Sequence, residues 1–503
     1  MDYFKSSDFS ARVEALMKQH HVPGIAVAVV QGEEIASAGY GHASLEPEKP
    51  CTADTLFDIA SASKSLTGAS VALLVESDEY PEVKWDAKMS KLLPEDFVLS
   101  EESYTQDVTV DDVLGHRTGM PRHDWSYMGT RAPRPDDTRS VTRSLRHLPV
   151  AAPIRSKFMY NNMMYTAAVH LVEQKSGLSY SDYLRKHFFE PLGMSSTSLQ
   201  PGRARARGHG DRIAAGHAWQ KDEEEYQSFQ TPDCPEAEGA GSIITSANDY
   251  IRWVKAMVRL EGPVTEAVRR GVTRGRTIVE PDGEDRQPLT DGGAYAAGWE
   301  VEHYRGHRVV AHSGGVPGFG TRHLFLPDHG FGCVVFGNSG AGGSVAEIVS
   351  KELVDEVLKV PETERVDWNQ KEVESEEKWL GEEKERREKI RQELCPGVEE
   401  SQAQTVPLEA YTGDYHNAGY HGMTVEIKDG GLFIDASDRS MGFLVTFEHV
   451  ADQTKYVMQM KDYLGGETYD TKAEFVLENG KATRMGLYLE SDLDDYIWFE
   501  RKQ

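Results

Sequence analysis

A serine and a lysine lie three positions apart in Ser61-Ala62-Ser63-Lys64, at the head of an apolar stretch. On a helix, side chains at positions i and i+3 are neighbours, so the lysine amine can reach the serine hydroxyl. Burial among apolar residues disfavours an ammonium ion and lowers the pKa of a lysine below its usual value of about 10.4. The pair therefore predicts a serine nucleophile with a lysine base that works near neutral pH.

Two later segments carry groups that a serine nucleophile needs. Tyr160 and Asn162 lie two positions apart, ahead of a stretch rich in Met, Ala and Val that predicts a helix. The phenol can relay a proton to a leaving group, and the amide can hold a substrate carbonyl or fix Lys64. His312-Ser313-Gly314-Gly315 follows an apolar strand, and Gly314 and Gly315 let the backbone approach closely and lend an N–H to an oxyanion.

These residues must be positioned by a sheet and by the helices packed on it. The segment 10–17 has helical spacing, and 65–290 is predicted to be mostly helical and rich in loops. The predicted fold class is α/β, of the α+β kind. We expect an antiparallel sheet flanked by helices, together with a helical lobe. The strands of the sheet come from both ends of this first part of the chain. Its strands are predicted at 25–30, 35–40, 308–311, 323–326 and 333–336.

The remainder of the chain changes character twice. The segment 361–406 is dense in Glu, Lys and Arg with i,i+4 charge pairs, which predicts a solvated helix that links two domains. From 407 to 503, short alternating segments surround turns such as Asp429-Gly430-Gly431 and predict a small antiparallel β-barrel. We therefore expect a catalytic domain at 1–360, a charged helical linker and a barrel domain at 407–503.

The composition excludes several classes of function. The chain has 503 residues and a net charge of −27, so nucleic acid and anionic membrane surfaces would repel it. It lacks the start of a signal peptide and any run of about 18 apolar residues, which predicts a cytoplasmic protein. Its four cysteines are scattered and its histidines lack metal-ligand spacing, so we expect no metal and no other cofactor.

Three motifs resemble, in type and order, those of the serine β-lactamase and penicillin-binding-protein superfamily, in particular its class C-like esterase and D-aminopeptidase branch. Residues 57–64 (FDIASASK) are similar to the nucleophile motif, Tyr160-Asn161-Asn162 to the Y-x-N motif, and His312-Ser313-Gly314 to an H-x-G form of K-T-G. The segment 114–121 (LGHRTGMP) also fits. The likeness covers about residues 8–350, and the segment 411–415 (YTGDY) resembles the opening of a lipocalin-like barrel that some relatives carry.

The resemblance implies roles for five residues. It implies Ser61 as the acyl-forming nucleophile, Lys64 as its base and Tyr160 as a second proton-transfer group. Asn162 would position the substrate. The backbone N–H groups of Ser61 and Gly315 would form the oxyanion hole, worth about 3 kcal/mol per donor.

His312 stands where the family usually has a lysine. A cation there helps to hold the carboxylate of β-lactam antibiotics, and a mostly neutral histidine would hold it less well. We therefore do not expect β-lactam hydrolysis to be the main activity. No acidic residue matches the separate deacylation role of class A enzymes, so deacylation would fall to Tyr160 and Lys64.

Residues and resemblance together predict a serine hydrolase that forms an acyl-enzyme with small ester, amide or peptide substrates, D-aminoacyl ones included. An acyltransferase would use the same acyl-enzyme with an alcohol or amine in place of water, and the sequence does not separate the two. A non-catalytic scaffold that assembles through the charged helix and the barrel is a third hypothesis. The oligomeric state stays open, with a homo-oligomer among the options.

Local alternatives also remain. The segment 311–315 (AHSGG) imitates the G-x-S-x-G elbow of α/β-hydrolases, which would make Ser313 the nucleophile, but an elbow must turn straight into a helix and 316–320 is loop sequence. Trp125, Tyr127 and Met128 either line an acyl pocket or only pack. The barrel either braces the catalytic domain or sends a loop near 419–421 into the cleft. The Arg-rich segment 203–212 is expected to be an exposed loop, and the alternative is that it shapes the mouth of the cleft.

Overall fold

The computed structural model describes every residue except 284–285, 398–399, 467 and 503. A nine-stranded antiparallel sheet has the order β3-β2-β1-β14-β13-β12-β11-β10-β9. The predicted construction from both ends is confirmed, because β1 pairs with β2 on one side and with β14 on the other. The strands are β1 Gly24–Gln31, β2 Glu34–Leu45, β3 Glu48–Pro50, β9 Thr277–Ile278, β10 Ala294–Tyr295, β11 Glu300–Tyr304, β12 His307–Val316, β13 Phe319–Leu326 and β14 Phe331–Gly337.

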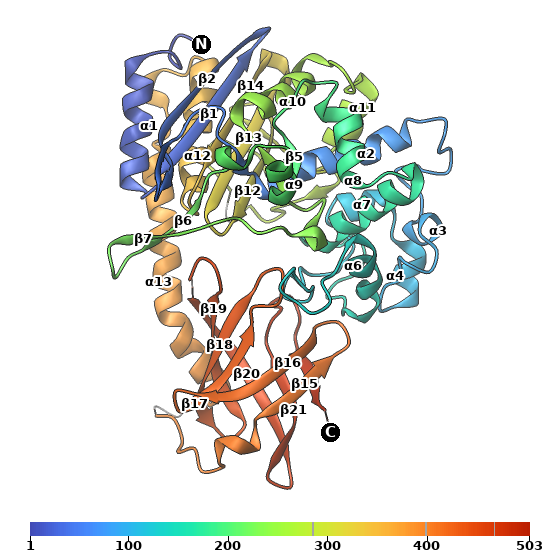
Figure 1. Cartoon of the computed structure of the whole chain (residues 1–503), viewed down its shortest axis with the longest axis vertical. Helices are drawn as coiled ribbons and strands as arrows, with labels where there is room; N and C mark the ends of the chain where they lie inside the picture. Colours follow the sequence, from blue (N-terminus) through green and yellow to red (C-terminus); the bar gives the residue numbers. More distant parts are fainter. Residues whose placement is uncertain (284–285, 398–399, 467, 503) are drawn as a thin grey trace.

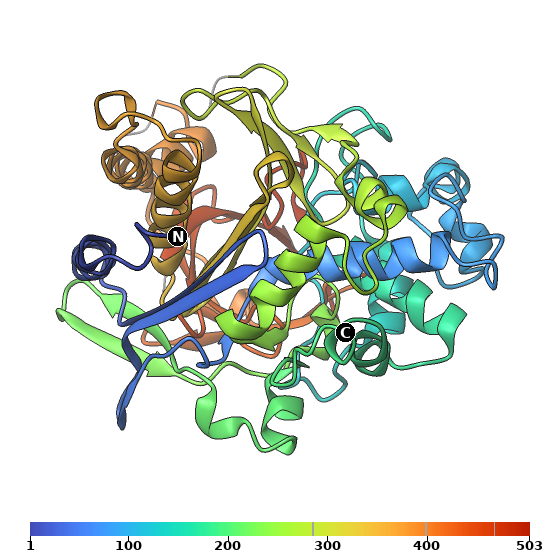
Figure 2. The same cartoon turned by 90° about the horizontal axis from the view of Figure 1, so that it is seen from above.

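Helices cover both faces of this sheet. Val27 and Val29 of β1 enter a core shared with α1 and α12, whereas Ala26 and Ala28 enter a core shared with α10. A strand that is buried on both faces must be apolar throughout, which explains the uninterrupted apolar run of β1. Figure 2 shows the sheet between these two helical layers. The helices are α1 Ser7–Gln19, α10 Ala247–Arg259 and α12 Gly342–Val357.

A helical lobe lies beside the sheet. Its central helix α2 (Lys64–Val75) is almost completely buried, and α7 (Asn162–Ser176) begins at Asn161, whose side chain accepts a hydrogen bond from the backbone N of Met164 at 2.9 Å. The other helices are α3 Met89–Leu92, α4 Glu102–Asp107, α5 Val110–Leu114, α6 Thr138–Ser144, α8 Tyr180–Leu184, α9 Pro201–Ala206 and α11 Glu266–Thr273. Two small sheets lie outside the nine-stranded one, β4-β8-β5 and the hairpin β6-β7. Their strands are β4 Phe57–Asp58, β5 Ser198–Leu199, β6 Gly216–Gln220, β7 Glu225–Phe229 and β8 Ile243–Thr245.

A long helix leads to a closed barrel at the other end of the molecule (Figure 1). The helix is α13 (Trp368–Leu394), and it matches the predicted solvated helix, with Trp368 buried at its start and Ile390 and Leu394 at its end. The predicted antiparallel barrel is confirmed, and pairing of its first and last strands closes it. Its strands are β15 Gly413–Asn417, β16 His421–Lys428, β17 Gly431–Ala436, β18 Phe443–Ala451, β19 Lys455–Asp462, β20 Thr468–Glu478, β21 Lys481–Leu487 and β22 Ile497–Arg501.

Two further observations concern the helices. The start of the Arg-rich segment is helical rather than a loop, because Pro201 presets the first turn of α9 and Ala204 is buried beneath it. Among the residues that the structure describes, none of the helices has the length and apolarity needed to cross a membrane.

Candidate active site

Ser61 lies in a tight 3₁₀ turn, Ala60–Ser63, that leads directly into α2. The sequence suggested an α-helical pair, whereas the structure places the serine one turn ahead of the α-helix. Ala60 has φ of +47°, a left-handed conformation that is costly for alanine, and its N–H donates to Oδ1 of buried Asp58 at 2.8 Å. Strain of this kind persists only where the surroundings fix the backbone, and it occurs preferentially at functional sites.

The Lys64 amine touches three oxygen atoms. Nζ lies 2.9 Å from Ser61 Oγ, 2.8 Å from Asn162 Oδ1 and 2.8 Å from the carbonyl oxygen of Ala240. Both carbonyl oxygens can only accept hydrogen bonds, so each takes one N–H. A neutral amine has only two N–H groups, and its lone pair is then left for the third neighbour, the hydroxyl of Ser61. The geometry therefore fits a neutral lysine that accepts the serine proton.

The surroundings of Lys64 favour this neutral form. The side chain is fully buried, and burial holds its pKa well below the usual value. The positive charge of Arg122 lowers the pKa further, whereas the negative charge of Asp124 opposes both effects. The buried neighbours that the sequence suggested, Phe57, Ile59, Leu66 and Val71, are indeed buried.

Asn162 is itself held in one orientation. Its Nδ2 donates to Asp124 Oδ1 at 2.9 Å, and since a carboxylate can only accept, the amide oxygen must face Lys64. Asp124 is buried and also accepts from Arg122 Nε at 2.7 Å and from the hydroxyl of Tyr127 at 3.2 Å. A buried carboxylate with three donors is well fixed, so the orientation of the amide follows from Asp124.

Tyr160 is packed among cationic and aromatic groups. Its ring centroid lies 4.8 Å from Lys64 Nζ, 5.0 Å from Arg122 Cζ and 4.3 Å from the ring of His116. Burial raises its pKa above the usual value, while a hydrogen bond with Ser61 and the charge of Arg122 act in the opposite direction. At neutral pH Tyr160 is therefore a neutral phenol, able to donate a proton but not by itself a base.

The sheet contributes His312 and the two glycines. His312 Nδ1 donates to the carbonyl oxygen of Ser313 at 2.6 Å, so Nε2 accepts from the hydroxyl of Tyr295 at 2.9 Å. Burial, with a smaller effect of the Lys64 charge, lowers the pKa of His312 to about 3, so this side chain is uncharged at neutral pH. A Cβ at Gly314 would lie 2.2 Å from the carbonyl oxygen of Ile59, whereas Gly315 has open space at that position. Of these two glycines, Gly314 is the one required by close packing, against the turn that carries Ser61.

Ser313 lies in the same strand and makes a different set of contacts. Its hydroxyl accepts from Arg322 Nη1 at 2.9 Å, and the same nitrogen lies 2.6 Å from Glu347 Oε2 on α12. The chain after Ser313 stays in β12 to Val316 and turns back as β13, so the helix that a nucleophile elbow requires is missing from this point. The elbow alternative for Ser313 is therefore wrong.

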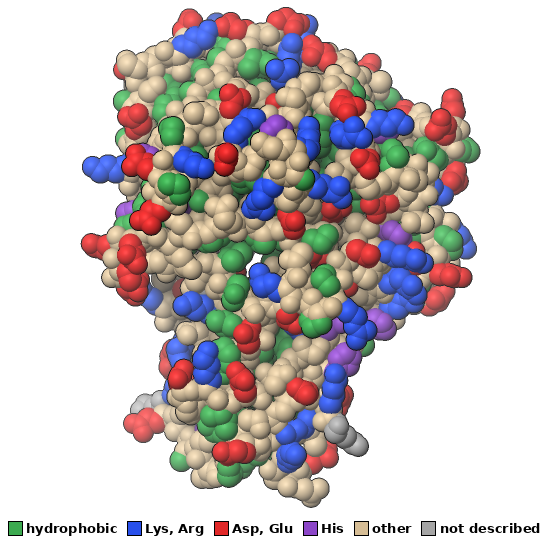
Figure 3. Space-filling model, in the orientation of Figure 1, with side chains coloured by type: hydrophobic (Ala, Val, Ile, Leu, Met, Phe, Trp, Pro, Cys, Tyr) green, Lys and Arg blue, Asp and Glu red, His purple; other side chains and the backbone are tan. Residues whose placement is uncertain are grey.

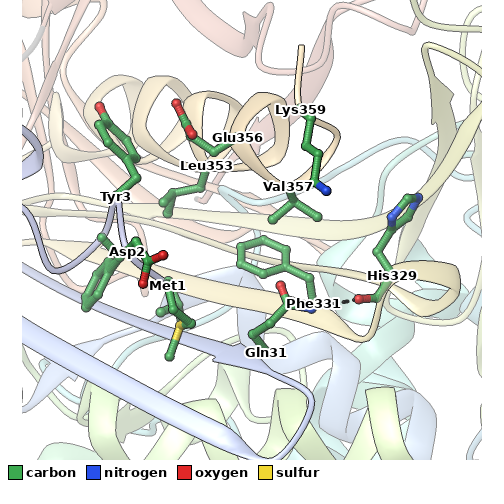
Figure 4. Close-up of a pocket in the computed structure, with 12 residues that line it drawn as sticks. Met1, Asp2, Tyr3, Gln31, His329, Phe331, Leu353, Glu356, Val357 and Lys359 are labelled. Atoms are coloured by element: carbon green, nitrogen blue, oxygen red, sulfur yellow. Dashed lines mark hydrogen bonds between the residues drawn. The ribbon is translucent and has the colours of Figure 1, made fainter.

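Other parts of the described structure offer no competing centre of this kind. No cluster of three or more His, Cys, Asp or Glu side chains with metal-binding geometry occurs among the described residues. A cavity of about 440 Å³ opens between the N-terminal segment, β14 and α12 (Figure 4). It is lined by Tyr3, Phe331 and Leu353 together with Gln31, whose amide donates to the carbonyl oxygen of His329, and it contains none of the site residues above.

Sequence reasoning missed four side chains that surround the predicted ones. His116 and Arg122 fall within or beside the segment 114–121, so a weak signal existed for them. Asp124 and Tyr295 carry no motif, and only the folded chain shows that they contact Asn162 and His312. All the predicted polar side chains converge, since Ser61, Lys64 and Asn162 share direct contacts and Tyr160 and His312 are linked to them through neighbouring rings.

Comparisons with known proteins agree with this fold. A family model described as Beta-lactamase matches residues 9–353, and one described as a domain of unknown function, DUF3471, matches 399–501. An unguisins hydrolase of Aspergillus campestris is 33% identical, over 98% of this chain and 92% of that protein. Another, of Aspergillus violaceofuscus, is also 33% identical, over 88% of this chain and 81% of that protein.

Solved structures show the same architecture. The octameric penicillin-binding protein homologue from Pyrococcus abyssi has a TM-score of 0.62 at 18% identity, over 98% of this chain and 99% of that one. The D-amino acid amidase from Ochrobactrum anthropi has a TM-score of 0.54 at 22% identity, over 70% and 98%. At these identities the likeness concerns the fold alone. From the family match and the relatives that span the whole chain, the chain belongs to the β-lactamase family of hydrolases.

Proposed function

We propose that this chain is a serine hydrolase that cleaves an ester or amide bond through an acyl-enzyme on Ser61. The observation that carries the proposal is the environment of Lys64, whose buried Nζ lies 2.8 Å from Asn162 Oδ1, 2.8 Å from the carbonyl oxygen of Ala240 and 2.9 Å from Ser61 Oγ. A neutral amine that donates to the two carbonyl oxygens has its lone pair left for Ser61. A buried lysine with a lowered pKa is a competent general base at neutral pH.

The reaction would proceed in two steps. Ser61 Oγ attacks the substrate carbonyl carbon and gives its proton to Lys64 Nζ, while the backbone N–H groups of Ser61 and Gly315 stabilise the oxyanion. The bond to the leaving oxygen or nitrogen breaks, and that atom takes a proton from Tyr160, which regains one from Lys64. Water then attacks the acyl carbon, loses a proton to the same pair, and Ser61 leaves with its proton restored.

We propose an amide of a peptide or amino acid as the substrate class, with simple esters as surrogate substrates. Two fungal relatives that cover most of the chain are named hydrolases of unguisins, which supports hydrolysis over acyl transfer. The uncharged His312 speaks against efficient β-lactam hydrolysis, because it cannot offer a cation to the carboxylate of a penicillin.

The test is intact-mass analysis during turnover of 4-nitrophenyl acetate, the D and L forms of phenylalanine amide, and benzylpenicillin. We expect an acyl adduct on the native chain that is absent in Ser61→Ala, with kcat/KM lower by about 10⁴-fold or more. Ser63→Ala is the matched control, because Ser63 lies in the same turn and its hydroxyl accepts from the N–H of Ile243 at 3.3 Å, away from Lys64. Its adduct and rate should stay close to those of the native chain.

Two outcomes would overturn the proposal. An adduct that persists in Ser61→Ala would place the nucleophile elsewhere, and absence of adduct and turnover with all substrates would remove the support for an acyl-enzyme. A native adduct that decays only when an amine or alcohol is added would replace the hydrolase by the acyltransferase.

A further inference from the structure

One residue of the lobe, His123, is held by the barrel. Glu490 Oε2 accepts from the backbone N–H of His123 at 2.7 Å, and the hydroxyl of Tyr420 lies 2.7 Å from His123 Nδ1. A further contact of the ring, Nε2 to the carbonyl oxygen of Pro149 at 2.9 Å, comes from the lobe itself. A carbonyl oxygen can only accept, so Nε2 carries the proton, Nδ1 is the acceptor, and Tyr420 donates.

His123 has a backbone conformation that needs such support. Its φ is +51°, in the left-handed region, and its side chain is completely buried. For a residue other than glycine this conformation costs about 1–3 kcal/mol and persists only when the surroundings fix it. The lobe also contributes Ser126, whose N–H and Oγ donate to the carbonyl oxygen of His123 at 3.0 Å and 2.6 Å. The hydrogen bonds to Nδ1 and to the backbone N–H of His123 come from the barrel, from residues that lie 297 and 367 positions further along the chain.

The neighbours of His123 are the residues that touch the active site. Arg122 lies against the ring of Tyr160, and Asp124 holds the amide of Asn162. The φ and ψ angles of His123 set the relative directions of these two side chains. A shift at His123 therefore moves both the group that orients Asn162 and the charge that lies beside Tyr160.

The barrel also contacts the chain a few residues after His123, at residues 127–129. Met128 forms an isolated antiparallel β-bridge with Arg439. Two backbone hydrogen bonds flank this bridge. The N–H of Gly129 donates to the carbonyl oxygen of Asp438 at 2.9 Å, and the N–H of Ser440 donates to the carbonyl oxygen of Tyr127 at 3.1 Å. Residues 123–129, named here the barrel-held segment, are thus fixed at both ends. Figure 3 shows the molecule hollowed on this face where the barrel meets the upper part of the chain.

We propose that Tyr420 and Glu490 of the barrel are positioning residues for the catalytic base, acting through His123, Asp124 and Asn162 on Lys64. The inference rests on the proposed function, because it assigns Lys64 the role of base. For the barrel, the sequence left open a bracing role or a loop near 419–421 that enters the cleft. In this proposal that loop acts through the contact of Tyr420 with His123. The barrel is then a working part of the acylation machinery.

The hydrogen-bonding roles within this link do not change over ordinary assay conditions. Burial lowers the pKa of His123 to about 4, so the imidazole stays neutral and keeps Nδ1 as an acceptor above that pH. Burial raises the pKa of Glu490, against the effect of the hydrogen bond from His123, and the charges of Asp492 and Asp124 raise it further. A neutral or ionised carboxyl can equally accept from an N–H, so this bond survives either state.

The decisive variant is Tyr420→Phe, which removes one hydroxyl from a fully folded chain. We expect the rate of Ser61 acylation by 4-nitrophenyl acetate, measured from the burst of nitrophenolate, to fall about 10- to 100-fold, because small misplacements of catalytic groups cost rates of this size. KM should change little, since Tyr420 is buried and its hydroxyl contacts His123. Glu490→Ala should act in the same direction, and Glu490→Gln, which keeps an oxygen acceptor, should restore most of the rate.

Asp492→Asn is the matched control. Asp492 forms an exposed ion pair with Lys157 at 3.2 Å, so it joins the barrel to the lobe without touching His123. Its acylation rate should equal that of the native chain. Thermal melting of every variant shows whether a lower rate comes from unfolding, because a purely structural role would lower the melting temperature without lowering the rate per folded molecule.

Failure of this inference is distinct from failure of the proposed function. If the native chain forms its Ser61 adduct while Tyr420→Phe and Glu490→Ala acylate as fast as Asp492→Asn, the positioning role is wrong and the serine hydrolase stands. Equal rates for Glu490→Gln and Glu490→Ala would also contradict it. If the native chain forms no adduct, it is the proposed function that fails.

Discussion

The candidate site has two walls that are held in different ways. On the sheet wall, His312 is fixed by Tyr295 and by its own strand, and Ser313 is tied through Arg322 to Glu347. All these groups belong to the β-lactamase-like part of the chain. On the lobe wall, Asn162 depends on Asp124, and the backbone beside Asp124 depends on the barrel.

This difference separates two functions within one site. In the proposed mechanism the sheet wall would present the oxyanion donor and the group that meets the substrate, and the contacts of His312 and Ser313 described above come from within this part of the chain. The lobe wall would orient Lys64, the proposed base, and part of its support comes from residues more than 290 positions away. A change in the barrel should therefore alter proton transfer while leaving the substrate-facing strand unchanged.

The largest effect should come from breaking the lobe wall at Asp124. Asp124→Asn removes a negative charge that raises the pKa of Lys64, so the acid limb of the pH profile of kcat/KM should move to lower pH. Loss of the fixed amide orientation should lower the plateau about 10- to 100-fold. kcat/KM should rise with pH in both proteins, because only neutral Lys64 is a base. An acid limb that stays in place would contradict the assigned neighbourhood of Lys64.

His312→Lys changes the sheet wall instead. The histidine is uncharged above about pH 3, whereas a lysine ammonium at this position could bind the carboxylate of benzylpenicillin. We expect the acylation rate with benzylpenicillin to rise about tenfold, equivalent to about 1.4 kcal/mol. The acid limb for ester hydrolysis, measured alongside, tests the separation of the walls. It should stay closer to the native position than that of Asp124→Asn.

Glu347→Gln should affect stability more than rate. It leaves the guanidinium of Arg322, whose side chain is 8% exposed, without its carboxylate partner, and should lower the free energy of unfolding by about 1–3 kcal/mol. Burial alone would raise the pKa of Glu347, but Arg322 and Lys351 hold it below its usual value. The contribution of ionised Glu347 to stability is therefore fully present above about pH 4.3, the usual pKa of a glutamate. It is lost as the pH falls through the lower pKa that Glu347 has in the folded chain. A large loss of acylation rate in Glu347→Gln at neutral pH would show that the sheet wall also affects the positioning of Lys64.

The smallest effect is expected at an exposed contact of the barrel. Arg131 Cζ lies 4.5 Å from the ring centroid of Tyr463, which is 44% exposed. Tyr463→Ala should lower stability by less than about 1 kcal/mol and leave the acylation rate unchanged. A loss of rate comparable to that of Tyr420→Phe would mean that the rate depends on contacts between the lobe and the barrel in general, and that the contacts of His123 have no specific role.

The sequence allowed prediction of whatever is encoded locally. Ser61 and Lys64 are three residues apart, Tyr160 and Asn162 two, and the alternation of apolar residues marks the sheet and the barrel strands. These features depend on helical and strand periodicity, which a single sequence displays directly. The resemblance to a known family then related the separate motifs to one another.

The remaining features depend on packing between distant segments. Asp124 looks like any surface aspartate until the fold brings Asn162, Tyr127 and Arg122 to it. The left-handed backbone of His123 has no signal in the residue type, and its partners lie in another part of the molecule. The tight turn at Ser61 was also missed, because serine followed by apolar residues suits either type of helix. The domain boundaries at 360 and 406 remain predictions.

The length of helix α13 determines where the barrel lies relative to the rest of the molecule. It is packed at its start through Trp368 and at its end through Ile390 and Leu394, and its 27 residues span about 40 Å. Removing one residue would shorten it by about 1.5 Å and turn the barrel by about 100°, while removing seven would nearly restore the angle but displace the barrel by about 10 Å. Neither change keeps Tyr420 opposite His123. Insertions or deletions that preserve this alignment must therefore fall in the loops on either side of α13. The helix acts as a spacer, and its number of residues determines whether Tyr420 reaches His123.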